Sequence, residues 1–170
     1  MAVKIIVGST ADVPKKVKER LIVVPLSVHF GDEEFMDGVT ITHDEFYTKL
    51  ENSLISPTTS QPSPMAFREK YEEVVKNGDS AVVITISSEF SGTYQSAVMG
   101  AKGLEDKVFV IDSKTASIGE GILVELLLSY HTLLINYLLL LKMYFLKIIV
   151  QQMVKISLLK KLIGGKLMDN

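Results

Sequence analysis

Short apolar segments alternate with amphipathic segments over the first 120 residues of the chain. Three apolar runs predict buried strands, over residues 3–7 (VKIIV), 80–86 (SAVVITI) and 108–111 (VFVI). The segment 22–30 (IVVPLSVHF) is also rich in β-forming residues, but Pro25 predicts an edge or interrupted strand, because proline cannot donate a hydrogen bond to a strand ladder. The strands of the predicted sheet are therefore far apart in the sequence.

Capping signals and helical periodicity predict helices between these strands. Thr42 and Glu45 form a capping-box pair, so a helix is expected over residues 43–52. Ser63 is expected to cap a second helix that ends at Gly78. Three further helices are predicted, over residues 14–20, over residues 93–103 and from Ile122 onward. Strands that alternate with helices predict an α/β domain with a mostly parallel β-sheet flanked by helices.

The carboxyl ends of parallel strands form the expected ligand-binding edge of such a domain. Four segments rich in Ser and Thr, and free of His, fall at this edge: 8–12, 57–63, 87–93 and 112–119. Hydroxyl groups and the N–H groups of helix N-termini can together bind a phosphate or a carboxylate. Each hydroxyl alone is as well explained by a cap or a turn, so the prediction of an anion site rests on the convergence of the four segments. Residues 31–38 are expected to form a hairpin or exposed loop, and residues 53–62 a polar loop.

Groups suited to catalysis are few. A serine nucleophile needs a base, usually His or Lys. His43 lies near the start of a predicted helix, where a solvent-facing residue is common, and His29 lies in the interrupted strand, where a structural histidine is common. Asp12 and Asp112 could serve acid–base chemistry, although aspartates at such positions more often fix turns. Gly119-Glu120-Gly121 lacks the third glycine of a dinucleotide-binding motif. A phosphoryl- or acyl-transfer enzyme, in which Asp12 or Asp112 acts with or without a metal ion, remains the alternative to a binding protein.

Charge divides the chain into two parts. Residues 1–130 contain 12 Lys and Arg against 19 Asp and Glu, whereas residues 131–170 contain six Lys and one acid, Asp169. The overall net charge of −2 does not favour nucleic-acid binding, which needs a concentrated basic face. With no Cys, and three His at no helical ligand spacing, neither a metal site nor a cofactor is predicted. The absence of cysteines and of a secretory signal predicts the cytoplasm.

The acidic part contains four distinctive strings: Ser9-Thr10-Ala11-Asp12, Thr59-Ser60-Gln61-Pro62-Ser63, Ser91-Gly92-Thr93-Tyr94-Gln95-Ser96-Ala97 and Val110-Ile111-Asp112-Ser113. In their order and spacing, these strings resemble the DegV family of bacterial fatty-acid-binding proteins. The resemblance covers about the first 120 residues. It implies an α/β domain packed against a second one, with a fatty acid between them and no intrinsic catalysis. It also implies a partner, a fatty-acid kinase subunit that phosphorylates the carboxyl group of the bound fatty acid.

The same resemblance implies which residues hold the carboxylate of a long-chain fatty acid. The hydroxyls of Thr59 and Ser91 are expected to donate hydrogen bonds to it, and the N–H groups of Ser60, Gly92 and Thr93 to flank it. Charge-assisted hydrogen bonds of this kind contribute about 1.5 to 3 kcal/mol each. This expectation agrees with the anion site that the hydroxyl-rich segments predict. The resemblance implies no metal ligand and no catalytic residue.

Two features depart from the family pattern. Gly8 stands where the family has Asp before the Ser-Thr-Ala-Asp string, and residues 131–170 show no counterpart of the second domain. Residues 132–150 approach the length of a membrane helix, but Lys142 and Lys147 interrupt them, which favours an amphipathic or core helix over a membrane span. The change in composition predicts two parts: an α/β domain over residues 1–130, and a basic, apolar, helical tail over residues 131–170. We interpret this tail as a truncated or out-of-frame remnant of the second domain. An inactive fragment is therefore a third alternative, beside the binding protein and the transfer enzyme.

Overall fold

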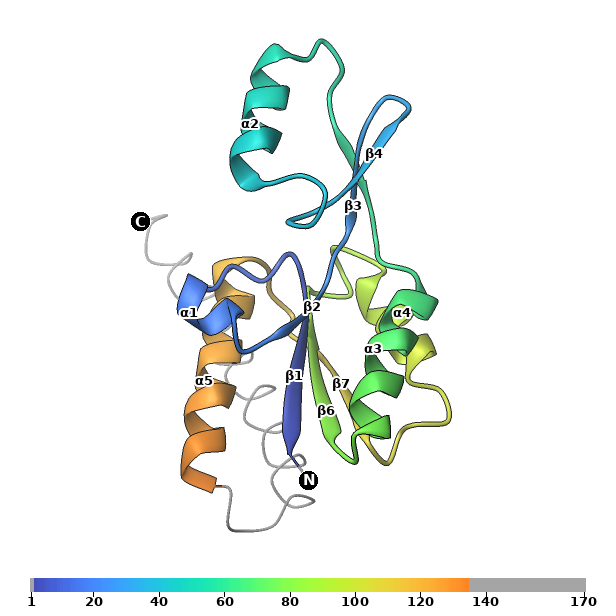
Figure 1. Cartoon of the computed structure of the whole chain (residues 1–170), viewed down its shortest axis with the longest axis vertical. Helices are drawn as coiled ribbons and strands as arrows, with labels where there is room; N and C mark the ends of the chain where they lie inside the picture. The colour runs from blue at the N-terminus through green and yellow to red at the C-terminus, as the bar shows by residue number, and fades with distance from the viewer. Residues whose placement is uncertain (1, 135–170) are drawn as a thin grey trace, which may run out of the picture. The chain divides into compact units, whose positions relative to one another are not determined.

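The computed structural model describes residues 2–134 of the 170-residue chain (Figure 1). Residues up to Glu125 form one compact unit. Its larger sheet has four parallel strands in the order β2-β1-β6-β7. These are β1 (Val3–Gly8), β2 (Ile22–Val24), β6 (Ser80–Thr85) and β7 (Val108–Asp112). The predicted α/β domain with a mostly parallel sheet is confirmed.

Helices α3 (Pro64–Lys76) and α4 (Thr93–Gly100) pack against each other and against the larger sheet (Figure 1). The apolar residues of α3 recur at helical spacing and therefore share one buried face. Together with the strands they form the main hydrophobic core, which includes Ile6, Phe67, Tyr71, Val83 and Ala97. Each large apolar side chain buried in this way contributes about 1.5 to 3 kcal/mol, so this core holds α3 and α4 on the sheet.

A second, smaller sheet is antiparallel, with the order β4-β3-β5. Its strands are β3 (Ser27–Phe30), β4 (Glu33–Met36) and β5 (Thr58–Ser60). Helix α2 (His43–Asn52) lies between β4 and β5 in the sequence and contributes Phe46 to a separate small core with Val28, Phe30 and Ile41. Only Pro25 and Leu26 separate β2 from β3, so the small sheet starts at the carboxyl end of the larger one (Figure 1).

Local signals at two helix starts act as predicted. The Thr42 hydroxyl accepts a hydrogen bond from the Glu45 N–H (3.3 Å), and the Glu45 carboxylate accepts one from the Thr42 N–H (2.8 Å). The Ser63 hydroxyl accepts a hydrogen bond from the Ala66 N–H (3.1 Å) at the start of α3. Both caps need only residues three positions apart, which explains why the sequence alone could predict them.

The predicted interruption of segment 22–30 at Pro25 is confirmed, because the chain leaves the larger sheet there and forms two strands in different sheets. Other predicted boundaries were wrong. Segment 53–62 contains β5, a three-residue polar strand without a hydrophobic alternation to reveal it. Helix α5 (Ile118–Leu134) begins four residues before Ile122, where the prediction placed its start. The prediction missed the first turn because two of its residues are glycines, which are unfavourable in helices. The remaining helices, α1 (Lys15–Lys18) and α4, are shorter than expected.

The predicted tail, residues 131–170, lies outside the described residues except for residues 131–134, which continue α5. Its interpretation as a remnant and the predicted domain boundary near Tyr130 therefore stay predictions. Among the described residues, no helix combines the length and the hydropathy that crossing a bilayer requires.

Candidate anion-binding site

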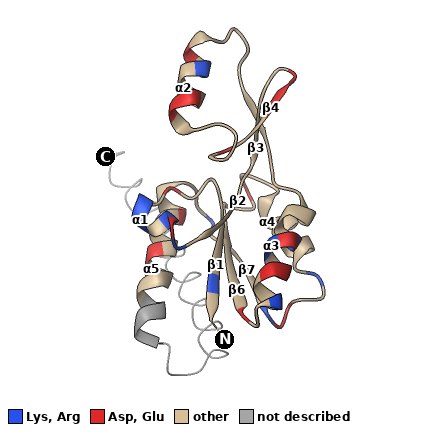
Figure 2. Ribbon diagram, viewed as in Figure 1, with Lys and Arg blue, Asp and Glu red and all other residues tan. Residues whose placement is uncertain are grey.

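Loops at the carboxyl ends of β1, β6 and β7 meet at one edge of the larger sheet. The parallel register places Val7 beside Ile84 and Thr85 beside Asp112, so the segments that follow these strands are neighbours. Of the two segments that carry the expected ligand contacts, 57–63 contains no charged residue and 87–93 contains only the acid Glu89, whereas acidic side chains gather on β4 and α2 (Figure 2). An anion bound by these two segments would therefore depend on hydroxyl and N–H donors.

The loop Ser87–Gly92 places the Ser91 hydroxyl at the start of α4. The N–H groups of Phe90 and Ser91 both donate to the Ser87 carbonyl oxygen, over 3.0 and 3.2 Å, and close a tight turn. The Ser91 Oγ lies 2.9 Å from the Thr93 Oγ1 and accepts a hydrogen bond from the Thr93 N–H (3.2 Å). A ligand would have to compete for the Thr93 N–H, while the first turn of α4 adds the donors that every helix start leaves without an intrahelical partner.

Strand β5 places Thr59 and Ser60 on opposite faces of the small sheet, because side chains alternate along a strand. Thr59 pairs with Val28 of β3, and Ser60 pairs with Ser27. The Ser60 Oγ lies 2.9 Å from the His29 Nε2, so its hydroxyl is already engaged. Within the described part of the chain, the Thr59 hydroxyl makes no side-chain hydrogen bond, which leaves it available to a ligand.

Gln61 brings the segment that carries Thr59 and Ser60 to the start of α4. Its side-chain Nε2 donates a hydrogen bond to the Ser96 Oγ (3.1 Å). This contact joins the predicted segment 57–63 to α4, the helix that begins at the end of the predicted segment 87–93. The structure therefore brings Thr59 and Ser60 into the same neighbourhood as the loop of Ser91.

A charged cluster lies beside the Ser91 loop. Asp112, at the end of β7, accepts hydrogen bonds from the N–H (3.1 Å) and the hydroxyl of Ser88 and forms an ion pair with Lys114 (2.9 Å). Burial by itself would raise the pKa of Asp112, but the hydrogen bonds from Ser88 and Lys114 outweigh it and hold the pKa below its ordinary value. The hydrogen bond to Asp112 raises the pKa of Lys114, although desolvation opposes it.

This cluster is unsuited to activating Ser88 as a nucleophile. Lys114 Nζ lies 3.1 Å from the Ser88 Oγ, but a general base must be able to lose its proton, and the contact with Asp112 stabilises the protonated amine. A structural role fits better, because the cluster ties the loop after β6 to the loop after β7.

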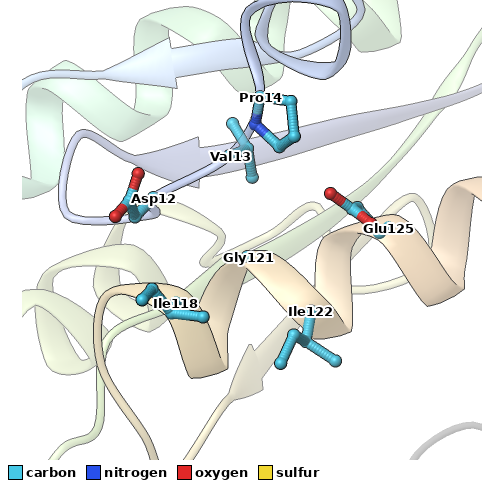
Figure 3. A pocket seen from close by; sticks show the side chains of 7 residues that line it. All are labelled: Asp12, Val13, Pro14, Ile118, Gly121, Ile122 and Glu125. Carbon is cyan, nitrogen blue, oxygen red and sulfur yellow. The ribbon is translucent and has the colours of Figure 1, made fainter.

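Asp12 lies in a different environment from Asp112. It lines a pocket of about 400 Å³ with Val13 and Pro14 and with residues of the first turns of α5, namely Ile118, Gly121, Ile122 and Glu125 (Figure 3). Its N–H donates to the Ser117 carbonyl oxygen (3.3 Å). No hydrogen bond or ion pair in the described part joins Asp12 to Asp112, and that part contains no group of three or more His, Cys, Asp and Glu that could hold a metal ion.

Glu120 is the buried acid that the sequence analysis did not single out. It lies in the first turn of α5, its exposed fraction is 0 %, and its Oε2 accepts a hydrogen bond from the Thr10 Oγ1 (3.0 Å). Burial raises the pKa of Glu120 to about 7, although the bond from Thr10 opposes the rise. The only sequence signal is its position between Gly119 and Gly121, which marks close packing around it.

Comparisons with known proteins agree with this architecture. The sequence model of the DegV family, described as "Uncharacterised protein, DegV family", matches residues 2–128. A DegV domain-containing protein of Clostridium perfringens is 39% identical over 125 residues, which make up 72% of this chain and 45% of that protein. A relative from Halalkalibacterium halodurans is 43% identical over 106 residues, 61% of this chain and 38% of its own length.

Solved structures show the same fold. A fatty-acid-binding DegV-family protein from Thermus thermophilus matches with a TM-score of 0.75 and 31% identity, over 89% of this chain and 54% of that one. A DegV lipid-binding protein from Thermotoga maritima matches with a TM-score of 0.76 and 31% identity, over 89% and 55%. The chain spans less than half the length of the curated relatives it matches. With the family model covering three quarters of its residues, this chain belongs to the DegV family.

Proposed function

We propose that this chain binds a long-chain fatty acid through its carboxylate. The observation that carries the proposal is the Ser91 hydroxyl at the start of α4. It is joined through Gln61 and Ser96 to a segment whose Thr59 hydroxyl makes no side-chain hydrogen bond to any of the residues that the structure describes. Neither segment has a basic residue, so the donors are hydroxyls and N–H groups. These suit a single carboxylate, since such donors form strong hydrogen bonds with an ionised acceptor.

Solved relatives support the choice of a fatty acid over other anions. Besides the two proteins above, a stearic-acid-binding protein from Eubacterium ventriosum is 32% identical with a TM-score of 0.72. A second protein from Thermotoga maritima, described as having a fatty-acid-binding function, is 30% identical with a TM-score of 0.72. In our proposal the carboxylate accepts hydrogen bonds from Thr59 and Ser91, and the N–H groups of Ser60, Gly92 and Thr93 flank it.

The chain itself performs no chemistry in this proposal. It presents the bound fatty acid, in the bacterial cytoplasm, to a kinase subunit that phosphorylates the carboxyl group. A phosphoryl- or acyl-transfer enzyme is the weaker alternative, because the lysine nearest to a candidate serine is kept protonated by Asp112. Formation of an acyl phosphate in a mixture of ATP, stearic acid and a bacterial fatty-acid kinase, dependent on this chain, tests the presentation step.

Native mass spectrometry of the purified 170-residue chain, with extraction and analysis of bound lipid, tests fatty-acid binding. Stearic acid should bind with one molecule per chain. Thr59→Ala and Ser91→Ala should each weaken binding by about 10- to 100-fold, the value of one charge-assisted hydrogen bond. Thr58→Ala is the matched control, because Thr58 lies on the same strand and, by alternation, on the other face from Thr59. A wild-type chain that binds no stearic acid would contradict the proposal and favour an inactive fragment.

A further inference from the structure

The contact between Gln61 and α4 connects parts of the chain that are far apart in sequence. Gln61 follows β5 directly, and the hydrogen bond from its Nε2 reaches Ser96, 35 residues later. Ser96 is buried, with an exposed fraction of 2 %, and it lies in the first turn of α4. The partner of Gln61 is therefore held rigidly by the helix and the main core.

Gly92 lies directly under the side-chain amide of Gln61. Its backbone has φ −72° and ψ 5°, a conformation that any residue adopts, so the turn itself does not require glycine. A Cβ atom at this position would overlap the Oε1, Cδ and Nε2 atoms of Gln61. The missing side chain of Gly92 is thus explained by the close approach of Gln61, and any side chain there would displace the amide.

Displacing Gln61 would also shift its neighbours in the chain. Thr59 and Ser60 precede Gln61 by two residues and one residue, while Ser91 and Gly92 form the loop on which its amide rests. Hydrogen bonds weaken steeply when their lengths and angles change. A displacement of Gln61 would therefore change the geometry between the donors of the two segments.

We infer that Gln61 is a positioning residue, which rests on Gly92, bonds to Ser96 and sets the spacing between the Thr59 and Ser91 donors. This inference rests on the proposed function, because it assigns a role to Gln61 in selecting a carboxylate headgroup. Gln61 itself need not touch the ligand. Its effect should therefore appear in the preference for the carboxylate and be absent from the binding of the alkyl chain.

The first test compares binding of stearic acid and methyl stearate to the full 170-residue chain. Gln61→Ala should weaken the binding of stearic acid by about tenfold or more. It should leave the binding of methyl stearate nearly unchanged, because the ester has no negative charge for the donors to hold. Ser96→Ala should act in the same direction, since it removes the acceptor of the Gln61 amide. Gln95→Ala is the matched control, an exposed glutamine one residue before Ser96 on the same helix.

Gly92→Ala supplies an independent variant. It keeps the N–H group and an allowed backbone, and the overlapping atoms belong to the far end of a flexible side chain, so the variant should fold and displace Gln61. Its loss of stearic-acid affinity should resemble that of Gln61→Ala. The double variant should lose no more than the larger single loss, because both changes remove the same contact.

The outcomes separate this inference from the proposed function. The positioning role would be overturned if Gln61→Ala left the affinity for stearic acid unchanged. It would also be overturned if the variant lost affinity for stearic acid and for methyl stearate equally. Wild-type protein that binds neither lipid would instead refute the proposed function. In that case amide chemical shifts decide the inference alone: Gln61→Ala should perturb both Thr59 and Ser91 more than Gln95→Ala does, and an absence of any shift at Ser91 would refute it.

Discussion

Thr10 donates a hydrogen bond to the buried carboxyl group of Glu120, with 3.0 Å between Oγ1 and Oε2. The bond joins the loop after β1 to the first turn of α5, across 110 residues of sequence. Among the described residues, the Glu120 Oε1 has no hydrogen-bond partner. A charged carboxylate in this position would lack solvation, which is why burial raises the pKa of Glu120 to about 7.

Glu120 should make the free energy of unfolding depend on pH. Because its folded pKa of about 7 lies above the ordinary 4.5, the folded state binds more protons than the unfolded state between these values. Stability should therefore fall as pH rises from 5 to 8. In Glu120→Gln this fall should be smaller by about 1 to 3 kcal/mol. Urea denaturation at pH 5, 6, 7 and 8 measures it, with the exposed Glu69→Gln as control; an unchanged pH slope in Glu120→Gln would contradict the assignment.

Gly121 should not tolerate a side chain. A Cβ there would overlap the backbone carbonyl of Asp12, which cannot move as a flexible side chain can. Gly121→Ala should lower the free energy of unfolding by about 1 to 3 kcal/mol through overpacking, although the same change stabilises an ordinary helix by about 0.5 to 1 kcal/mol. Gly8→Ala is the comparison, because its Cβ would make only an ordinary contact of 3.4 Å with the Thr10 hydroxyl. Equal urea midpoints for the two variants would show that α5 does not lie this close to Asp12.

Asp112 should stabilise the loop that carries Ser91. Its pKa is held below the ordinary 3.8 in the folded state, so its contribution is complete above that value and is lost as pH falls below it. Asp112→Asn should therefore lower thermal stability at pH 7, and the difference from wild type should narrow toward pH 3. It should also weaken the binding of stearic acid several-fold, because Ser88, in the loop that carries Ser91, loses a charged hydrogen-bond acceptor. Asp32→Asn, at an exposed position, should change neither melting temperature nor affinity.

Tyr71 links α3 to α4 through its hydroxyl group, which donates to the Ala97 carbonyl oxygen (3.2 Å) inside the main core. Tyr71→Phe removes this donor and keeps the ring, so it should lower the free energy of unfolding by about 1 kcal/mol. Tyr47→Phe on α2, where the tyrosine is 49 % exposed, should have almost no effect. Urea denaturation distinguishes the two variants. If Tyr47→Phe lowered the free energy of unfolding as much as Tyr71→Phe does, the buried hydrogen bond of Tyr71 would add no stability of its own.

Residues close together in sequence were enough to predict much of this fold. The continuous apolar runs of β1, β6 and β7 predict buried strands, and the caps at Thr42 and Ser63 predict helix starts. Their order predicts a parallel sheet and places hydroxyl-rich segments at one edge. The same strings carry the resemblance to the DegV family, so the sequence by itself determined the family and the fold class.

The tertiary structure alone decided which distant groups meet. Strand β5 has no hydrophobic alternation and is defined only by pairing with β3, and the first turn of α5 forms despite two glycines because it packs against the Asp12 segment. The contact of Gln61 with Gly92 and the bond of Thr10 to Glu120 also join residues far apart in the chain. Local propensities act over about four residues, whereas these contacts depend on how sheet and helices bring remote segments together.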